Sequence, residues 1–153
     1  MPSLAQGTGY AVLAMGYIAS AGGKPMLVRS VAEACDIPAP YLSKIINRLA
    51  RAGLVKTQRG VNGGVLLAHE ARDITLKDVC VALDDPVIEK RCMLGTETCS
   101  DERACPAHEF NMSVREKMLT FLEGTSIADV SAFEVRRRWN SNAATVGGAS
   151  ERA

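Results

Sequence analysis

The sequence predicts a mainly α-helical protein with one small β-hairpin. Three observations support this fold class: apolar residues recur at helical spacing in several segments, a turn rich in glycine separates two short strand-like runs, and prolines and glycines fall between these segments. With 153 residues, 47% of them apolar, the chain can bury one sizeable core or two small ones. We therefore expect one compact unit with appendages.

Two helices are expected first. Residues 8–20 carry small and large apolar side chains around almost the whole helical circumference and are followed by Gly22 and Gly23, so this segment should be a buried core helix. Arg29–Cys35 should form a short second helix. It ends at the sequence DIPAP, where two prolines suit a tight turn.

The third predicted helix, Pro40–Ala52, has a proline in its first turn, where a missing N–H does no harm, and Gly53 just past its end. Its apolar residues recur at i, i+3, i+4 and i+7 and should form a buried stripe: Leu42, Ile45, Ile46 and Leu49. The other face is cationic and able to hydrogen-bond: Ser43, Lys44, Asn47, Arg48 and Arg51.

Residues 54–68, LVKTQRGVNGGVLLA, predict two short strands joined by a turn rich in glycine and asparagine. Two helices separated by a turn and followed by a hairpin are typical of a winged helix-turn-helix, in which the second helix enters a DNA groove and the hairpin forms the wing. This order makes 40–52 the candidate recognition helix.

The basic residues of this unit favour double-stranded DNA as the partner. Lys44, Arg48 and Arg51 share one helical face, and Arg59 lies where a wing tip could enter a minor groove. No acidic residue occurs in 41–60. A basic face that is merely solvated is the alternative, and we prefer the DNA interpretation because the turn and the hairpin accompany this face.

Two further helices are expected after the hairpin. Thr75–Leu83 should begin at an N-cap threonine, with Asp78 placed to form a near capping box. A longer helix over Pro106–Glu123 should stop at Gly124, and its apolar residues form a seam: Phe110, Val114, Met118, Phe121 and Leu122. This seam is a candidate dimer contact, and packing onto the chain's own core is the alternative. We expect a homodimer, because single modules of this kind bind DNA weakly.

The chain should end in one more helix and a tail. The helix over 125–139 should be capped by Thr125 or Ser126, and the small, polar residues that follow predict disorder. The expected organisation is a winged helix-turn-helix domain over 1–70, a cysteine-bearing loop with dimerisation helices over 71–139, and a disordered tail over 140–153.

Three cysteines and a histidine gather between the two parts of the chain, with spacing C-x6-C-x5-C-x2-H: Cys92, Cys99, Cys105 and His108. If Cys105 is the N-cap of the following helix, His108 falls at its third position, and the two side chains can bind one metal centre. This donor set would suit a structural zinc ion, but the long gaps favour a larger iron–sulfur cluster. Both possibilities remain open on spacing alone.

The rest of the sequence limits the class of protein. The apolar run near the start lacks a basic leader and is too short to span a bilayer, so a cytoplasmic protein with reduced thiols is expected. Cys35 and Cys80 fall on apolar helix faces and should be buried. No nucleophile with its base, phosphate-binding glycine loop or carboxylate pair is present, so we do not expect an enzyme. A zinc-stabilised DNA-binding protein and a small electron carrier are the remaining alternatives.

The segments GYAVLAM, PAPYLSKIINRLARAGLVKTQRGVNGGVLLA and ITLKDVCVALDD, followed by the three-cysteine loop, resemble the Rrf2 family of bacterial winged-helix regulators over about Leu4–Trp139. The resemblance implies a homodimer with a long dimerisation helix and an iron–sulfur cluster whose presence or state alters DNA binding. It further implies a transcriptional regulator, most simply a repressor that senses redox state, iron–sulfur status or nitric oxide.

The resemblance also assigns residues. Cys92, Cys99 and Cys105 match the cluster cysteines and His108 matches the histidine ligand of IscR-like members, which favours a two-iron two-sulfur (2Fe-2S) cluster. NsrR-like members supply a carboxylate ligand from an N-terminal segment. The matching segment here reads AQGTGYA and offers no carboxylate, so a 4Fe-4S cluster is the second choice. One extra residue between Cys92 and Cys99 departs from the IscR-like pattern. The matching DNA-facing positions are Tyr41, Ser43, Lys44 and Arg48 in the recognition helix and Arg59, Val61 and Asn62 in the wing tip. Pro40 and Ser43 differ from the best-known members, which points to a different operator.

Overall fold

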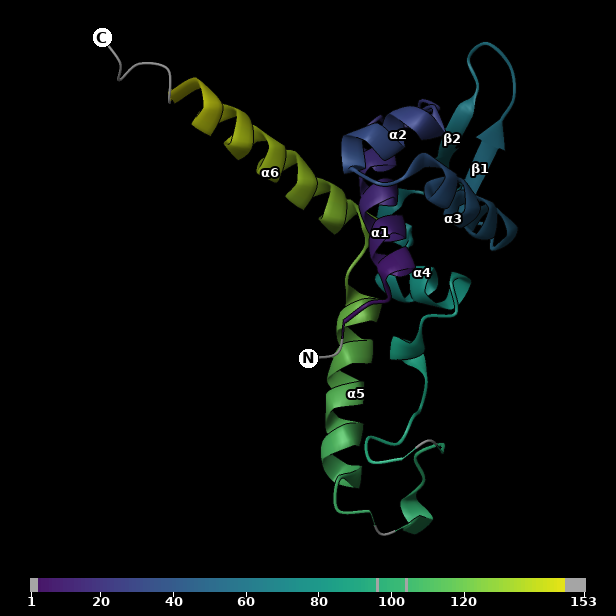
Figure 1. Cartoon of the computed structure of the whole chain (residues 1–153), viewed down its shortest axis with the longest axis vertical. Helices are drawn as coiled ribbons and strands as arrows, with labels where there is room; N and C mark the ends of the chain where they lie inside the picture. The colour runs from purple at the N-terminus through teal and green to yellow at the C-terminus, as the bar shows by residue number, and fades with distance from the viewer. Residues whose placement is uncertain (1–2, 96, 104, 148–153) are drawn as a thin grey trace.

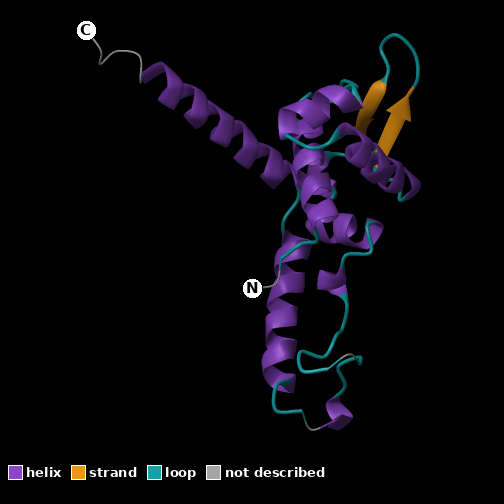
Figure 2. Cartoon of the chain, in the orientation of Figure 1, coloured by secondary structure: helices purple, strands orange, loops and turns teal. Residues whose placement is uncertain are grey.

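The computed structural model describes residues 3–95, 97–103 and 105–147, with only the helical backbone for 138–147. Within this part the chain forms six α-helices, three short 3₁₀ turns and one two-stranded antiparallel sheet (Figures 1 and 2). The predicted mainly α-helical class with a hairpin wing is confirmed. No helix in the described residues is long and apolar enough to cross a membrane.

The first three helices form the helix-turn-helix unit. They are α1 (Gln6–Ala19), α2 (Val28–Cys35) and α3 (Ala39–Arg51). Helix α3 begins at a proline pair, and Gly53 follows its end at a φ of 77°, a left-handed conformation that favours glycine. The predicted stripe of α3 is buried: Leu42, Ile45, Ile46 and Leu49.

The wing consists of β1 (Val55–Gln58) and β2 (Gly64–Leu67), which pair antiparallel with Val55 opposite Leu67 and Gln58 opposite Gly64. Met26 adds one bridge to Val65 on the other edge of β2, with two backbone hydrogen bonds of 2.8 and 2.9 Å. A Cβ at Gly64 would lie 2.4 Å from the Met26 carbonyl oxygen, so this close approach requires glycine. The wing is therefore fixed to the chain segment before α2.

One hydrophobic core connects the reading unit, which is the helix-turn-helix unit α1–α3 together with the wing, to the C-terminal helices. Its fully buried large side chains include Met15 from α1, Leu49 from α3, Val79 from the next helix and Ile127 near the C-terminus. Helix α4 (Leu76–Ala82) contributes to this core and begins at the predicted capping box, in which the Thr75 hydroxyl accepts from the Asp78 N–H. The capping prediction is confirmed.

The last two helices leave the core in different directions. Helix α5 (His108–Gly124) runs away from the reading unit, with Leu122 buried near its C-terminal end, and α6 (Ile127–Gly147) packs its first turns on α1 before it projects from the body (Figure 1). A reciprocal pair between Ser126 and Asp129 caps α6, so Ser126 is the cap among the two predicted candidates, Thr125 and Ser126. The cysteine-bearing segment is the chain between the turn Pro86–Ile88 and α5, residues 89–107, of which 96 and 104 lie outside the described residues. It lies beside the N-terminal end of α5, far from the wing (Figure 1).

Two expected helix boundaries are corrected. Helix α5 begins at His108 with Ala107 as its N-cap, not at Pro106 with Cys105 as its N-cap. The reason is that residues 106 and 107 form a turn in which the Cys105 carbonyl accepts from the His108 N–H. Helix α6 continues to Gly147 across residues expected to be disordered. Ala143 and Ala144 are strong helix formers and no proline interrupts this stretch. The rest of the predicted tail, 148–153, lies outside the described residues.

Candidate DNA-binding surface and metal centre

The outer face of α3 is exposed along its length. Its exposed residues are Tyr41, Ser43, Lys44, Asn47, Arg48 and Arg51. Tyr41 is only 38% exposed, because its ring packs edge-on against Tyr10 of α1 with ring centroids 5.7 Å apart. The face therefore combines an anchored aromatic ring with extended cationic side chains. Such a surface can approach both phosphates and base edges.

One of these cations is already engaged. The Arg48 guanidinium donates to the Asp84 carboxylate, with 2.8 Å between Nη2 and Oδ2. Asp84 lies just after α4, 36 residues further along the chain. Lys44 and Arg51 form no ion pair among the described residues. To bind a DNA phosphate or base, Arg48 must therefore first leave Asp84, whereas Lys44 and Arg51 need not break an ion pair within the described residues.

The wing tip presents its predicted residues to solvent. Arg59, Val61 and Asn62 are all exposed, and Val61 is fully exposed, at 105% relative exposure. Gly60 takes a φ of 109°, and its carbonyl accepts from the Gly63 N–H at 3.0 Å, which turns the chain back into β2. This tight turn leaves Arg59 at the entrance of the tip, where a flexible cation can reach a neighbouring groove.

The cysteine-bearing segment folds back on itself beside α5. Arg91 pairs antiparallel with Thr98, the Cys92 N–H donates to the Glu97 carbonyl at 2.9 Å, and the Cys99 N–H donates to the Lys90 carbonyl at 3.1 Å. This isolated bridge and the two hydrogen bonds hold Cys92 and Cys99 on neighbouring antiparallel stretches of the segment. Backbone hydrogen bonds therefore hold residues 90–92 against residues 97–99, with one cysteine on each side.

The structure brings Cys99 and His108 together. Sγ of Cys99, which is buried, lies 3.2 Å from Nδ1 of His108, and Nε2 of His108 lies 2.8 Å from a carboxylate oxygen of Asp101. When Nε2–H donates to Asp101, Nδ1 keeps its lone pair on the side of Cys99. This is the arrangement in which an outer carboxylate orients a histidine for ligation.

Cys105 and Cys92 are connected to this pair through backbone hydrogen bonds. Cys105 is connected through its carbonyl, which accepts from the His108 N–H at 3.0 Å, and Cys92 lies across the isolated bridge. Among the residues that the structure describes, no group of three or more metal-binding side chains converges. The chemistry of the set still fits an iron–sulfur cluster, because it offers three soft thiol sulfurs and an oriented imidazole within one short segment.

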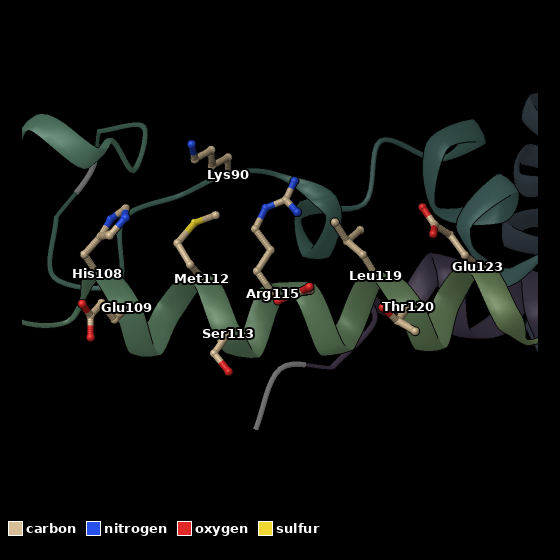
Figure 3. A pocket seen from close by; sticks show the side chains of 10 residues that line it. Lys90, His108, Glu109, Met112, Ser113, Arg115, Leu119, Thr120 and Glu123 are labelled. Carbon is tan, nitrogen blue, oxygen red and sulfur yellow. The ribbon is translucent and has the colours of Figure 1, made fainter.

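A hollow of about 670 Å³ adjoins this segment along α5 (Figure 3). His108, Met112, Arg115 and Leu119 follow one another along the side of the helix that faces Lys90. The Arg115 guanidinium donates to the Ile88 carbonyl at 2.8 Å. This bond fastens the beginning of the cysteine-bearing segment to α5.

The two cysteines outside this segment differ in burial. Cys80 is completely buried in α4, and burial, together with the nearby Asp85 carboxylate, raises the pKa of its thiol to about 11. Cys35 is half-buried. The prediction of burial is confirmed for Cys80 and holds in part for Cys35, and neither residue lies in the cysteine-bearing segment.

Three acidic residues near these sites were not predicted from the sequence. Asp84 pairs with Arg48, Asp85 fastens the start of α1, and Asp101 contacts His108. Asp84 and Asp85 contact residues that are distant in sequence, and Asp101 contacts His108 across an irregular loop. Periodic sequence patterns do not report contacts of either kind. Only the consecutive acids in LDDP, directly before the cysteine-bearing loop, offered a signal.

The comparisons with known proteins agree with this arrangement. The family model Rrf2, described as an iron-dependent transcriptional regulator, matches residues 4–132. The HTH-type transcriptional regulator IscR of Yersinia pseudotuberculosis is 32% identical over 139 residues, which cover 87% of this chain and 84% of that protein. Among solved structures, T. potens IscR has a TM-score of 0.67 at 28% identity and covers 84% of this chain and 85% of that one. CymR, the global cysteine regulator of B. subtilis, has a TM-score of 0.72 at 25% identity and covers 87% and 98%.

A recognition helix with an exposed basic face and a wing, on a fold shared with these regulators, defines a winged-helix DNA-binding transcriptional regulator and not an enzyme. More particularly, the chain belongs to the Rrf2 family. The electron-carrier alternative has no support from this membership.

Proposed function

We propose that this regulator is a homodimeric repressor whose affinity for DNA depends on an iron–sulfur cluster. The cluster is most simply 2Fe-2S, and its proposed ligands are Cys92, Cys99, Cys105 and His108. The observation that carries the proposal is the 3.2 Å approach of Cys99 Sγ to His108 Nδ1, with Asp101 orienting the imidazole from its other side. The similarity to IscR proteins supports the same assignment.

The bound cluster would supply a redox-active and oxygen-sensitive group whose charge and ligation change with its state. The chain's own residues do the rest. The cysteine-bearing segment is fastened to α5 at Arg115 and leads back to α4, so a change in its conformation reaches both helices. The mechanism is a population shift between dimer geometries that suit or do not suit two DNA half-sites.

Helix α5 supports the dimer proposal. Three members of the predicted seam point away from the core or lie at its edge, with Phe110 60% exposed and Phe121 56% exposed, while Val114 is half-buried. Apolar side chains in a continuous stripe on a helix that leaves the body favour burial against a second copy. The other two members, Met118 and Leu122, pack on the chain's own core. The proposed dimer contact therefore uses the exposed part of the seam, and Met118 and Leu122 take the internal role that was the alternative.

DNA contacts are proposed for the exposed residues of α3 and the wing: Tyr41, Ser43, Lys44, Arg48, Arg51, Arg59, Val61 and Asn62. In this arrangement the α3 residues face a major groove, and Arg59 reaches an adjacent minor groove or its phosphates. Phosphate contacts by the cations give an affinity that falls steeply as salt rises.

Cysteine variants test this proposal. Protein prepared without oxygen should contain iron and sulfide, and replacement of Cys92, Cys99 and Cys105 by alanine should remove both and change the affinity for a duplex selected by the wild-type protein from a random library. Cys80→Ala is the matched control and should retain the cluster. Triple-variant protein that binds the duplex with the affinity of cluster-loaded wild type would contradict the proposed coupling.

A regulator that works without a cluster is the second candidate. It is favoured by the similarity to the global cysteine regulator CymR and by the absence of three converging metal-binding side chains in the described residues. A colourless, iron-free protein that binds the selected duplex would support this candidate, and a zinc assay on the same sample would identify the zinc-stabilised form.

A further inference from the structure

The turn after α4 places an acidic side chain on the DNA-reading face. Asp84 has a φ of 48°, a left-handed conformation, and its N–H donates to the Val81 carbonyl at 3.3 Å. In the next position the Asp85 N–H donates to the Cys80 carbonyl at 2.9 Å. These two hydrogen bonds fix the backbone from which the Asp84 carboxylate extends to Arg48.

The Asp84–Arg48 pair is open to solvent, with 90% of the Asp84 side chain and 47% of the Arg48 side chain exposed. An exposed ion pair adds little to the stability of a fold. It does occupy the cation, because any phosphate or base edge that binds Arg48 must displace the carboxylate or approach a second negative charge.

Asp85 connects this turn to the rest of the molecule. Asp85 is 1% exposed as a residue, and its two carboxylate oxygens accept from the Ala5 N–H and the Val87 N–H, both at 2.9 Å. The first bond holds the beginning of α1, and the second begins the turn Pro86–Ile88 that leads to the cysteine-bearing segment. The two hydrogen bonds of the buried Asp85 carboxylate, just before that segment, therefore fix the position of Asp84.

We propose that Asp84 competes with DNA for Arg48, and that the cysteine-bearing segment adjusts DNA affinity by moving Asp84 toward or away from this arginine. This inference rests on the proposed function. It assigns to Asp84 a role in setting affinity without any contact with DNA of its own. Asp85 acts as the positioning residue that transmits the conformation of the segment.

The test uses Asp84→Asn, which removes the charge and keeps a side chain that tolerates a left-handed backbone. Affinities for the duplex selected by wild-type protein are measured by fluorescence anisotropy at fixed salt, before and after removal of iron. Asp84→Asn should bind more tightly by about 1.4-fold to five-fold, the range that an exposed ion pair spans. The ratio of affinities between the two iron states should also move toward one.

Two further variants separate competition from a general effect of charge. Glu123→Gln removes a carboxylate from another exposed pair, with Lys77, away from α3, and should leave the affinity near that of wild type. In an Arg48→Ala background, Asp84→Asn should have no more effect than this control. Circular dichroism and the melting temperature establish that each variant folds.

The outcomes are distinguishable. Equal strengthening by Asp84→Asn with and without Arg48, or weaker binding by Asp84→Asn, would overturn the competition. Tighter binding with an unchanged ratio between iron states would overturn the link to the cysteine-bearing segment. If the wild-type protein selects no duplex, or its affinity does not depend on iron, the proposed function itself fails.

Discussion

The cysteine thiols of this protein lie in different environments, and Cys80 and Cys92 show the contrast. Cys80 is completely buried, and its thiol pKa is raised to about 11 by burial first and by the Asp85 carboxylate second. Because thiolate is the reactive form, this residue should be inert at neutral pH. Cys92, in contrast, is half-buried on an exposed loop.

Cys80 should therefore resist iodoacetamide in the folded, metal-free protein at pH 8, while Cys92 is modified. Peptide mapping by mass spectrometry after a short exposure measures both sites in one sample, and unfolding in urea should make their rates similar. Equal modification of the two residues in folded protein would contradict the burial of Cys80.

The raised pKa of Cys80 also makes stability depend on pH. The folded state holds the thiol proton above its ordinary pKa of 9.0, so the contribution is complete below about pH 9 and is lost as the pH rises toward about 11. The free energy of unfolding of wild-type protein should fall over this range more than that of Cys80→Ala. Parallel curves in urea titrations would show that this thiol does not contribute.

Asp101 is expected to orient His108. In metal-free wild-type protein the imidazole should carry its proton on Nε2, next to the Asp101 carboxylate, and Asp101→Ala should give a mixture of tautomers visible in nitrogen-15 NMR. Iron retention should also weaken by about 10-fold to 100-fold, as for other outer-shell partners. Glu102→Ala changes an exposed acid of the same turn and should leave both properties unchanged. A single Nε2–H tautomer in Asp101→Ala would contradict this role.

Among the elements, the contact between α1 and α6 depends on a glycine. A Cβ at Gly16 would lie 2.9 Å from Cγ1 of Val130 and 3.4 Å from the Ser131 nitrogen, whereas a Cβ at Gly9 in the same helix would meet nothing within 4 Å. Val130 is β-branched and cannot easily rotate away. The two glycines therefore form a matched pair.

Gly9→Ala should stabilise the protein by about 0.5–1 kcal/mol through helix propensity. Gly16→Ala should destabilise it by about 1–3 kcal/mol, because overpacking separates α1 from α6. Urea unfolding followed by circular dichroism measures both effects. If Gly16→Ala stabilises as much as Gly9→Ala, the two helices do not pack as described.

Periodicity and caps predicted the individual elements well. The buried stripe of α3, the hairpin and the capping box of α4 all follow from short-range patterns, which local physics determines. The predicted start of α5 was wrong, because the Cys105 carbonyl accepts from the His108 N–H in a turn and Cys105 does not cap the helix with its side chain. The Arg48–Asp84 and His108–Asp101 contacts could not be predicted, because they depend on how elements pack and how an irregular loop folds.

At the scale of the whole molecule, the reading unit and the cysteine-bearing segment lie at opposite ends of the chain's long axis (Figure 1). Helices α4 and α5 occupy the space between them. Communication between the two ends must therefore pass through packed helices, through the turn at Asp85 that connects α4 to the cysteine-bearing segment, or through a second copy bound at α5.

Neighbouring residues of α5 should separate folding from dimerisation. Leu122 is 1% exposed, so Leu122→Ala should cost about 2–5 kcal/mol of unfolding free energy. Phe121 is 56% exposed, so Phe121→Ala should leave the fold of each copy intact but weaken self-association, measured by sedimentation equilibrium. A Phe121→Ala protein that associates like wild type would exclude this part of the seam from the dimer contact.

The most informative measurement is a visible absorption spectrum of protein prepared without oxygen, with iron and sulfide assays, followed by DNA titration of the same sample before and after the iron is removed. We expect a coloured protein with iron and sulfide in equal amounts, a salt-dependent DNA affinity, and a clear change in that affinity when the iron is lost. A pale, iron-free sample, or an affinity that is the same in both forms, would contradict regulation by a cluster.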